Sequence, residues 1–237
     1  HIGGMAATLR LVELIEPRPG DVVLDVGCGV GIGPVFLAEQ YRCRAVGVDV
    51  TPRMIKRSQE RAERRGINDL TAFHVADMHR LPFENDRFDS AIAESVLTFS
   101  ADKTAVINEL ARVVRPGGMV AFTEAIWIKL PPEDKRDFMA RAGGMPEGVL
   151  SHGEWQDILA ASRLQGIVAE AYRVTAREES KNQYGRIQPA DYLRTVPNFF
   201  RAIRQARFRR VFRTAAGSLP GDYFNHIGYG IYSGEAA

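Results

Sequence analysis

Residues 22–31 read VVLDVGCGVG, an apolar run that passes directly into three alternating glycines. The run Val22–Val26 follows a turn at residues 19–21 and is typical of a buried strand. Glycines at the end of such a strand allow a sharp turn and let the backbone approach a ligand without Cβ clashes. The stretch therefore predicts a strand, a ligand-binding turn and a following helix.

The same alternation of strand and helix continues along the chain. Apolar runs predict further strands at Ala45–Val50, Thr71–Val75, Phe88–Ala93 and Met119–Ala125, with helices at residues 5–16, 52–65 and 103–114. Strands that alternate with helices of this length indicate βαβ units, and so an α/β fold with a parallel sheet covered by helices on both faces.

The later part of the chain is less regular. Strands are expected at Gly166–Ala176 and Tyr223–Gly234, separated by helical segments. With no internal repeat or linker composition, we expect a single domain over residues 1–237. Its core comprises about residues 5–126, 151–176 and 221–234, with helical insertions at about 127–150 and 177–220.

Composition narrows the class of protein. The chain has 31 basic and 29 acidic residues, a net charge of +2, which argues against bulk nucleic-acid binding. No apolar run reaches membrane-spanning length. The two cysteines, Cys28 and Cys43, do not form a disulfide framework and favour a reducing cytoplasm. Histidines and cysteines form no metal-ligand pattern, so no metal is expected.

The glycine turn has several interpretations. A dinucleotide site requires Gly-x-Gly-x-x-Gly, but Ile32 occupies the third glycine position, and a phosphate-binding Walker loop is excluded because no Gly-Lys-Ser/Thr follows. Exposed N–H groups at the turn favour a carboxylate-bearing ligand. Asp25 disfavours a pyrophosphate and suits an amino group, while Asp49, at the end of the second strand, suits the hydroxyls of a ribose.

These residues resemble motif I of class I S-adenosylmethionine-dependent methyltransferases. Further matches follow in the family's order: Asp49, then Ala76–Met78, Leu81–Phe83 before Phe88, and Arg115–Gly118. Together they resemble the small-molecule "type 11" branch, which includes quinone C-methyltransferases and natural-product and sugar O-methyltransferases. The resemblance covers roughly residues 5–126 and implies a Rossmann-like, mostly parallel sheet of seven strands whose last strand is antiparallel.

The resemblance also implies roles for individual residues. The methionine and ribose part of the cofactor would contact Asp25, Gly27, Cys28, Gly29 and Gly31. Asp49 would hold the ribose hydroxyls, while the adenine would meet Val50, Met54, Asp77 and Met78. Glu94, after the fourth strand, would lie near the methionine amino group and the reaction centre.

A general base is harder to assign. The stretch after the fourth strand, residues 94–99, lacks the histidines that some sugar O-methyltransferases of this branch place there. Glu124 is the candidate catalytic residue, because it lies near the carboxyl end of an otherwise apolar strand and is costly to bury without a role or a partner. The structural alternative is an ion pair or a hydrogen bond to a helix N-terminus.

The insertions suggest a substrate cover. Large apolar side chains are frequent there and line a pocket, pack the helices, or do both: Trp127, Phe138, Met139, Met145, Tyr184, Tyr192, Phe199, Phe200, Phe208 and Phe212. The segment Arg194–Arg213 has seven arginines and no acidic residue. These arginines do not lie on one helical face, so pairing with the protein's own acidic surface or with a partner subunit is favoured over membrane binding.

The sequence thus predicts a cytoplasmic methyltransferase that moves the methyl group of S-adenosylmethionine to a small, partly apolar metabolite. The alternatives are a quinone or phospholipid methyltransferase at a membrane surface and a non-catalytic S-adenosylmethionine-binding subunit. An oxidoreductase requires that Ile32 be tolerated in the turn. No nucleic-acid partner is expected, since residues 94–96 lack the Asn/Asp-Pro-Pro motif of amino-methylating nucleic-acid enzymes. Homo-oligomer formation is left open.

Overall fold

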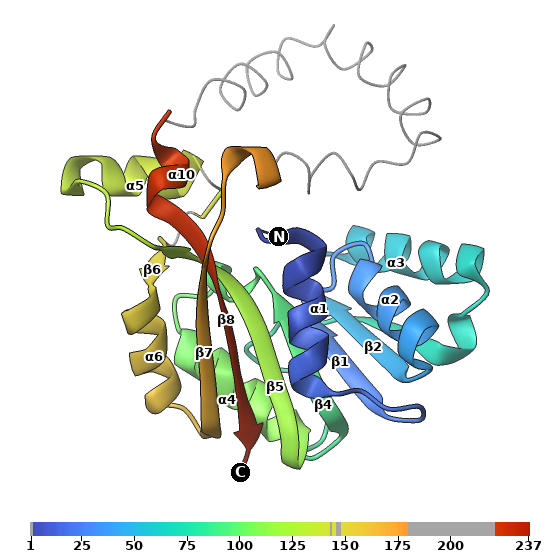
Figure 1. Cartoon of the computed structure of the whole chain (residues 1–237). Helices are drawn as coiled ribbons and strands as arrows, with labels where there is room; N and C mark the ends of the chain where they lie inside the picture. Colours follow the sequence, from blue (N-terminus) through green and yellow to red (C-terminus); the bar gives the residue numbers. More distant parts are fainter. Residues whose placement is uncertain (1, 143, 146–147, 180–220) are drawn as a thin grey trace, which may run out of the picture.

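One twisted sheet forms the centre of the molecule (Figure 1). The computed structural model describes residues 2–142, 144–145, 148–179 and 221–237. The sheet contains β1 (Val22–Val26), β2 (Arg44–Asp49), β3 (Thr71–Val75), β4 (Phe88–Glu94), β5 (Val114–Trp127), β6 (Leu150–Ser151), β7 (Leu164–Arg173) and β8 (Ile227–Ala236).

The strand order is β3-β2-β1-β4-β5-β8-β7, and the two-residue β6 pairs with the end of β5. Strands β1 to β5 are parallel, whereas β8 runs antiparallel to both of its neighbours. The order reverses between β1 and β4, and open α/β sheets bind ligands beyond the carboxyl ends of the strands at such a point.

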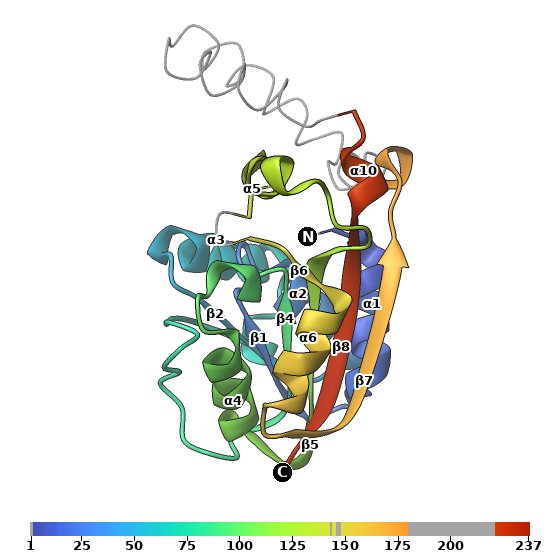
Figure 2. The ribbon, with the colours of Figure 1, turned by 90° about the vertical axis from the view of Figure 1, so that its left-hand side faces the viewer.

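Helices cover both faces of the sheet. On one face lie α1 (Gly4–Ile15), α2 (Ile32–Tyr41) and α3 (Pro52–Arg65); on the other lie α4 (Lys103–Val113) and α6 (His152–Ala160). Figure 2 shows α1 and α6 on opposite sides of β8. Each face has its own core, with Leu11, Leu37 and Ile92 in one, and Leu110, Phe122 and Trp155 in the other.

The predicted α/β fold with an antiparallel last strand is confirmed, with three local differences. The sheet gains the short β6. Strand β5 begins at Val114 and runs through Pro116, because a register shift between Phe88 and Ser90 accommodates the Pro-Gly-Gly turn. The last element begins as a helical turn, α10 (Tyr223–His226), in which Tyr223 and His226 are both buried.

The structure extends beyond the sheet at its carboxyl end. There, α5 (Glu133–Ala142) and α10 lie past the ends of the parallel strands (Figure 1). Most of the second predicted insertion, including Arg194–Arg213 and its aromatic side chains, lies outside the described residues. Within the described part of the chain, no helix combines the length and apolar character needed to cross a membrane.

Candidate active site

Three carboxylates lie at or next to the carboxyl ends of three neighbouring strands. Asp25 lies on β1, Asp49 is the last residue of β2, and Glu94 is the last residue of β4. Parallel pairing aligns Asp25 with Gly47 of β2 and with Ile92 of β4, so the three side chains occupy the same edge of the sheet. This edge is the switch point at which the fold predicts a ligand.

The glycine turn has the backbone geometry that its sequence requires. Gly27, Gly29 and Gly31 have φ angles of 73°, 54° and 76°, in the left-handed region that L side chains rarely adopt. A Cβ at Gly27 would also lie 2.5 Å from Cγ2 of Val96, in the turn after β4. The glycine turn and the turn after β4 therefore lie in close contact at Gly27. This contact is possible only because glycine has no Cβ.

Asp25 is held beneath the start of α2. It is 3% exposed, and a Cβ at Gly33, in the first turn of α2, would collide with its carboxylate. Burial raises the pKa of Asp25 well above its usual range, and the nearby charges of Glu94 and Asp49 raise it further. A buried acidic group of this kind favours a cationic ligand, which restores its charge.

A cavity of about 400 Å³ opens over these groups. Its lining includes the predicted Asp25, Gly27, Cys28, Gly29 and Glu94. It also includes residues that the sequence analysis did not select: Met5, Thr8, Val30, Ile32, Gly33, Phe36 and Arg61. The Thr8 hydroxyl donates a 2.8 Å hydrogen bond to Glu94, which orients that carboxylate. Met5 and Thr8 lie on one face of α1. Their spacing predicts the helix, but it does not show that this face borders the cavity.

Four backbone N–H groups of the turn, which the sequence analysis expected to face a ligand, donate to acceptors within the protein. Those of Gly27 and Cys28 donate to the Val48 carbonyl at 2.8 and 2.9 Å. The Gly29 N–H donates to Oδ2 of Asp49 at 3.1 Å, and the Gly31 N–H donates to the Cys28 carbonyl. These four hydrogen bonds hold the turn in its shape.

The predicted ribose and adenine residues lie beside the cavity. Oδ1 of Asp49 accepts the Thr51 N–H at 2.8 Å, so this carboxylate ties the glycine turn to the start of α3. Val50 is exposed and Met54 is half-buried in the first turn of α3. Both flank the carboxyl end of β2, where an adenine would follow a ribose held by Asp49.

Asp77 and Met78 lie in the turn after β3. The Asp77 side chain is exposed and accepts from both the backbone N–H and Nδ1 of His79, and these bonds hold its pKa below the usual range. Nε2 of His79 in turn lies 2.7 Å from the Ser100 hydroxyl. The structure therefore fixes the position of the Asp77 carboxylate, but the lining of the described cavity does not include it.

Glu124 adopts the structural alternative. It has no exposed surface, and its Oε1 accepts the Leu97 N–H at 2.6 Å, at the start of the 3₁₀ helix Leu97–Phe99. Burial raises the pKa of Glu124 to about 8, against the opposing effect of the backbone N–H groups of Leu97, Thr98 and Val96. Glu124 therefore stabilises the turn after β4 through its hydrogen bond from the Leu97 N–H, and it does not line the cavity.

The apolar residues predicted for the substrate cover differ in their burial. Trp127, Met139 and Met145 are buried in a small core with Tyr223 of α10, whereas Phe138 is exposed. Packing of the cover thus accounts for three of the four predicted residues that the structure describes. Among the described residues, no group of histidine, cysteine and acidic side chains could hold a metal ion.

Comparison with known proteins agrees with this geometry. Residues 24–122 match the family model described as a methyltransferase domain. The methyltransferase GfsG of Streptomyces halstedii is 33% identical over 123 residues, 52% of this chain and 44% of the relative. The 27-O-demethylrifamycin SV methyltransferase of Amycolatopsis mediterranei (strain S699) is 30% identical over 165 residues, 69% of this chain and 61% of the relative.

The fold is also similar to that of known methyltransferases. A phosphoethanolamine N-methyltransferase 2 from Haemonchus contortus, solved with phosphomonomethylethanolamine and S-adenosylhomocysteine, superposes with a TM-score of 0.76 at 18% identity, covering 99% of this chain and 53% of that one. The molecule is therefore a Rossmann-like α/β protein whose strand order reverses between β1 and β4. Residues 24–122 are thus similar to a methyltransferase domain, and the two relatives named above are methyltransferases. The chain spans less than half the length of GfsG.

Proposed function

We propose that this protein is an S-adenosylmethionine-dependent methyltransferase that acts on a small, partly apolar metabolite. The observation that carries the proposal is the cavity in which the glycine turn, Asp25 and Glu94 meet at the end of the sheet. A methionine amino group and a sulfonium are both cationic, and two carboxyl groups in one partly buried cavity suit them.

The residues present fit the cofactor part by part. Asp25 and Glu94 would receive the amino group, the glycine turn would form the wall against the methionine chain, and Asp49 would hold the ribose hydroxyls. Val50, Met54, Asp77 and Met78 would surround the adenine. A pyrophosphate fits poorly, because its negative charge would meet the carboxyl groups of Asp25 and Glu94 in the cavity.

Bound S-adenosylmethionine supplies an electrophilic methyl group on a sulfonium. The acceptor forms a bond to this carbon as the carbon–sulfur bond breaks, and S-adenosylhomocysteine leaves as the thioether. The task of the protein is to hold the two reactants in line and to exclude water. Because Glu124 is buried under the turn after β4, we assign it a positioning part in place of the predicted base; an acidic acceptor proton would then pass to solvent or to the acceptor's own groups.

The nature of the acceptor is supported less directly. Met5 and Phe99 are half-exposed apolar side chains at the carboxyl end of the sheet, which suits a partly apolar molecule. One relative named above is a 27-O-demethylrifamycin SV methyltransferase, and the structural neighbour is a phosphoethanolamine N-methyltransferase, so we leave the acceptor atom open. Near-neutral net charge favours a metabolite over a nucleic acid.

Two wider features belong to the same proposal. We infer a reducing, cytoplasmic setting, supported by Cys28 and Cys43, which are both buried free thiols. Burial raises the pKa of the Cys28 thiol far above its ordinary value, so it stays protonated. We also propose that the chain forms one domain, in which the cover segments are insertions into the methyltransferase fold.

Transfer of a labelled methyl group tests the proposal. The protein is incubated with S-adenosylmethionine carrying a CD₃ group and with small apolar acceptors that present a hydroxyl, an amine or an activated carbon. We expect S-adenosylhomocysteine and an acceptor heavier by one CD₃ group, both absent with Gly27→Ala. Tight cofactor binding with no transfer to any acceptor would favour the non-catalytic binding subunit.

A further inference from the structure

A chain of three polar side chains joins two turns at the carboxyl end of the sheet. In the turn after β3, Nδ1 of His79 lies 2.7 Å from Oδ1 of Asp77, and the His79 backbone N–H donates to the same oxygen at 2.9 Å. Nε2 of His79 lies 2.7 Å from Oγ of Ser100, which directly follows the 3₁₀ helix Leu97–Phe99. The cofactor contacts proposed for this site use Asp77 but neither His79 nor Ser100.

The chemistry of the three groups sets the direction of both side-chain hydrogen bonds. The backbone N–H and the imidazole of His79 hold the pKa of Asp77 below its usual range, so near neutral pH its carboxylate is ionised and can only accept. Nδ1 of His79 therefore carries the proton that it donates to Oδ1. In the neutral ring Nε2 is then an acceptor, and the Ser100 hydroxyl donates to it.

Ser100 is the fixed end of this chain. It is 1% exposed, its backbone N–H donates to the Leu97 carbonyl at 3.0 Å, and its carbonyl accepts from Nζ of the buried Lys103 at 2.8 Å. The Asp77 side chain, in contrast, is exposed, and an exposed side chain without a partner samples several rotamers. The imidazole of His79 therefore connects a buried, hydrogen-bonded residue to a surface carboxylate and limits the movement of that carboxylate.

The second oxygen of Asp77 is open to a ligand. Both hydrogen bonds that His79 donates to this carboxylate end on Oδ1. Within the described part of the chain, no donor binds Oδ2. Because 62% of the Asp77 side chain is exposed, a ligand can reach this oxygen. Asp77 thus presents one oriented oxygen that still lacks a hydrogen bond from the protein.

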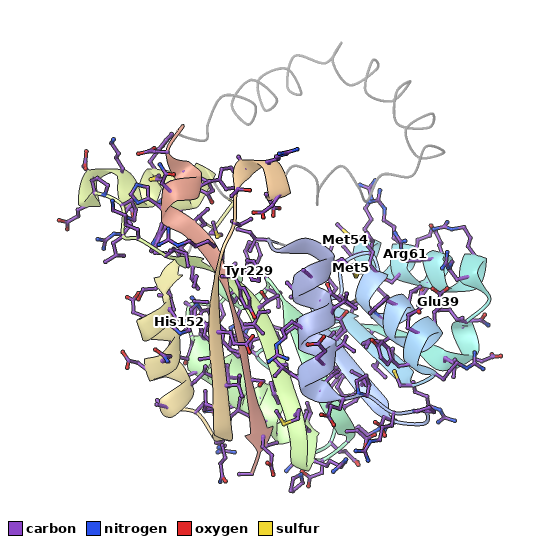
Figure 3. All side chains as sticks on the ribbon, in the orientation of Figure 1. Met5, Glu39, Met54, Arg61, His152 and Tyr229 are labelled. Carbon is purple, nitrogen blue, oxygen red and sulfur yellow. The ribbon has the colours of Figure 1, made fainter. Side chains whose placement is uncertain are left out.

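Asp77 also follows the strand that neighbours the predicted ribose residue. Val75 of β3, two residues before Asp77, pairs with Asp49 at the end of β2. Met54, the proposed adenine neighbour on α3, lies at the same end of the molecule as Met5 of the cavity (Figure 3). The base of a cofactor whose ribose is held by Asp49 would therefore lie toward Asp77.

We infer that His79, held by Ser100, positions Asp77 so that the site selects a base with an exocyclic amino group. An oriented Oδ2 accepts an N–H donor, which adenine carries at its 6-position, and repels the oxygen that hypoxanthine presents there. His79 and Ser100 are positioning residues, because they act through Asp77. The inference rests on the proposed function, including the adenine role of Asp77, and adds the two residues that make this role selective. The competing explanation is that His79 only braces the turn.

Two cofactor analogues that differ only in the base separate these explanations. S-adenosylhomocysteine presents an amino group, and S-inosylhomocysteine presents an oxygen on the same carbon. Calorimetry on the whole chain measures the ratio of their affinities. Loss of a brace weakens both ligands alike, whereas loss of a positioned carboxylate changes the ratio.

The variants at position 79 distinguish the two nitrogens of the imidazole. The amide nitrogen of asparagine falls near the place of Nδ1, so His79→Asn retains the donor to Asp77. The amide of glutamine reaches the place of Nε2, so His79→Gln retains only the contact with Ser100, and His79→Ala retains neither. His74→Ala is the matched control, because His74 is an exposed histidine of β3 that lies close in sequence and has no hydrogen bond to Asp77.

We expect the wild type to bind S-adenosylhomocysteine about 10- to 100-fold more tightly than S-inosylhomocysteine, the effect of a hydrogen bond to a charged group. His79→Ala should lower this preference about 3- to 10-fold, because a free carboxylate must be ordered on binding. S-inosylhomocysteine affinity should stay within about twofold of the wild-type value. His79→Gln should resemble His79→Ala, whereas His79→Asn and His74→Ala should retain the preference.

Ser100→Ala tests the fixed end of the chain. It removes the hydroxyl that donates to Nε2 of His79, and we expect the preference to fall about 2- to 5-fold. An unchanged preference in Ser100→Ala would overturn the role of Ser100. Equal weakening of both ligands by His79→Ala, or an unchanged preference in that variant, would overturn the inference as a whole.

The outcome for the wild type separates this inference from the proposed function. If the wild type binds neither analogue, the proposed function itself fails. If it binds both with equal affinity, the proposed function stands and only the present inference fails. The His79 side chain is 41% exposed, so its variants should fold, and thermal unfolding checks this for every variant.

Discussion

The cofactor edge of the sheet and the cover beyond it are built by different means. At the ends of β1, β2 and β4, short motifs set the backbone, and the backbone then places Asp25 and Glu94 in the cavity and Asp49 beside it. In the cover, α5 and α10 are joined to the sheet by a small apolar core around Trp127, Met139 and Tyr223. The first region therefore tolerates little change in local geometry, and the second tolerates little change in volume.

The largest expected effect comes from Gly27→Ala. An alanine at position 27 would have to adopt the left-handed φ of 73°, and its Cβ would lie 2.5 Å from Cγ2 of Val96. We therefore expect the free energy of unfolding to fall by about 2–4 kcal/mol. S-adenosylhomocysteine affinity should fall by about 100-fold or more, since a misplaced wall removes several contacts. Thermal unfolding and calorimetry measure the two effects.

Gly20→Ala is the control for that variant. Gly20 also has a positive φ, of 95°, but a Cβ there meets nothing within 4 Å. We expect a strain cost of about 1–2 kcal/mol with no change in affinity. If Gly20→Ala weakened cofactor binding as strongly as Gly27→Ala, general destabilisation would explain both results. The close approach of residue 27 to Val96 would then have no specific effect on binding.

Met139→Ala tests the cover. Met139 has no exposed surface, and removing its side chain should cost about 2–5 kcal/mol of stability through lost burial and a cavity. Neighbouring Phe138 is exposed, so Phe138→Ala should stay within about 0.5 kcal/mol. Neither variant should alter S-adenosylhomocysteine affinity; a large effect of Met139→Ala on binding would show that the two regions are not separate.

Sequence reasoning succeeded where local chemistry decides the structure. The glycine turn and the strand-end carboxylates occupy the expected places because the left-handed glycines and the parallel sheet leave them few alternatives. It failed where packing between distant elements decides. Thr8, Phe36 and Arg61 come to the cavity from three different helices. For Glu124, the sequence left a base and a structural role open, and its hydrogen bond from the Leu97 N–H could be seen only in the structure.

Glu124, buried beside the turn after β4, gives a pH-dependent prediction. Its carboxyl has an ordinary pKa of 4.5 when unfolded and about 8 when folded, so the unfolded state releases its proton first. Stability should therefore fall as the pH rises from about 4.5 to about 8, by about 2 kcal/mol or more. Glu124→Gln keeps an acceptor for the Leu97 N–H and should match the wild type near pH 5 but exceed it near pH 9. Unfolding curves at both pH values would contradict this if the two proteins differed equally at each.

The smallest effect concerns the protonation of Asp25. Burial and neighbouring negative charges raise the pKa of Asp25, and a bound ammonium should lower it again, so cofactor binding should release protons at a pH between the pKa values of the free and the bound protein. Titration of S-adenosylhomocysteine in two buffers of different ionisation enthalpy measures this release. Asp25→Asn should abolish it, and buffer-independent heats in the wild type would show that Asp25 does not exchange a proton on binding.

The central claim is that the edge formed by β1, β2 and β4 binds S-adenosylmethionine. Calorimetry with S-adenosylmethionine, S-adenosylhomocysteine and NAD, on the wild type and Asp49→Ala, tests it most directly. We predict micromolar binding of both sulfur compounds, about 100-fold weaker in Asp49→Ala because two hydrogen bonds to a carboxylate are lost, and no binding of NAD. Binding of NAD, or of none of the three, would contradict the assignment and support a dehydrogenase or a different ligand.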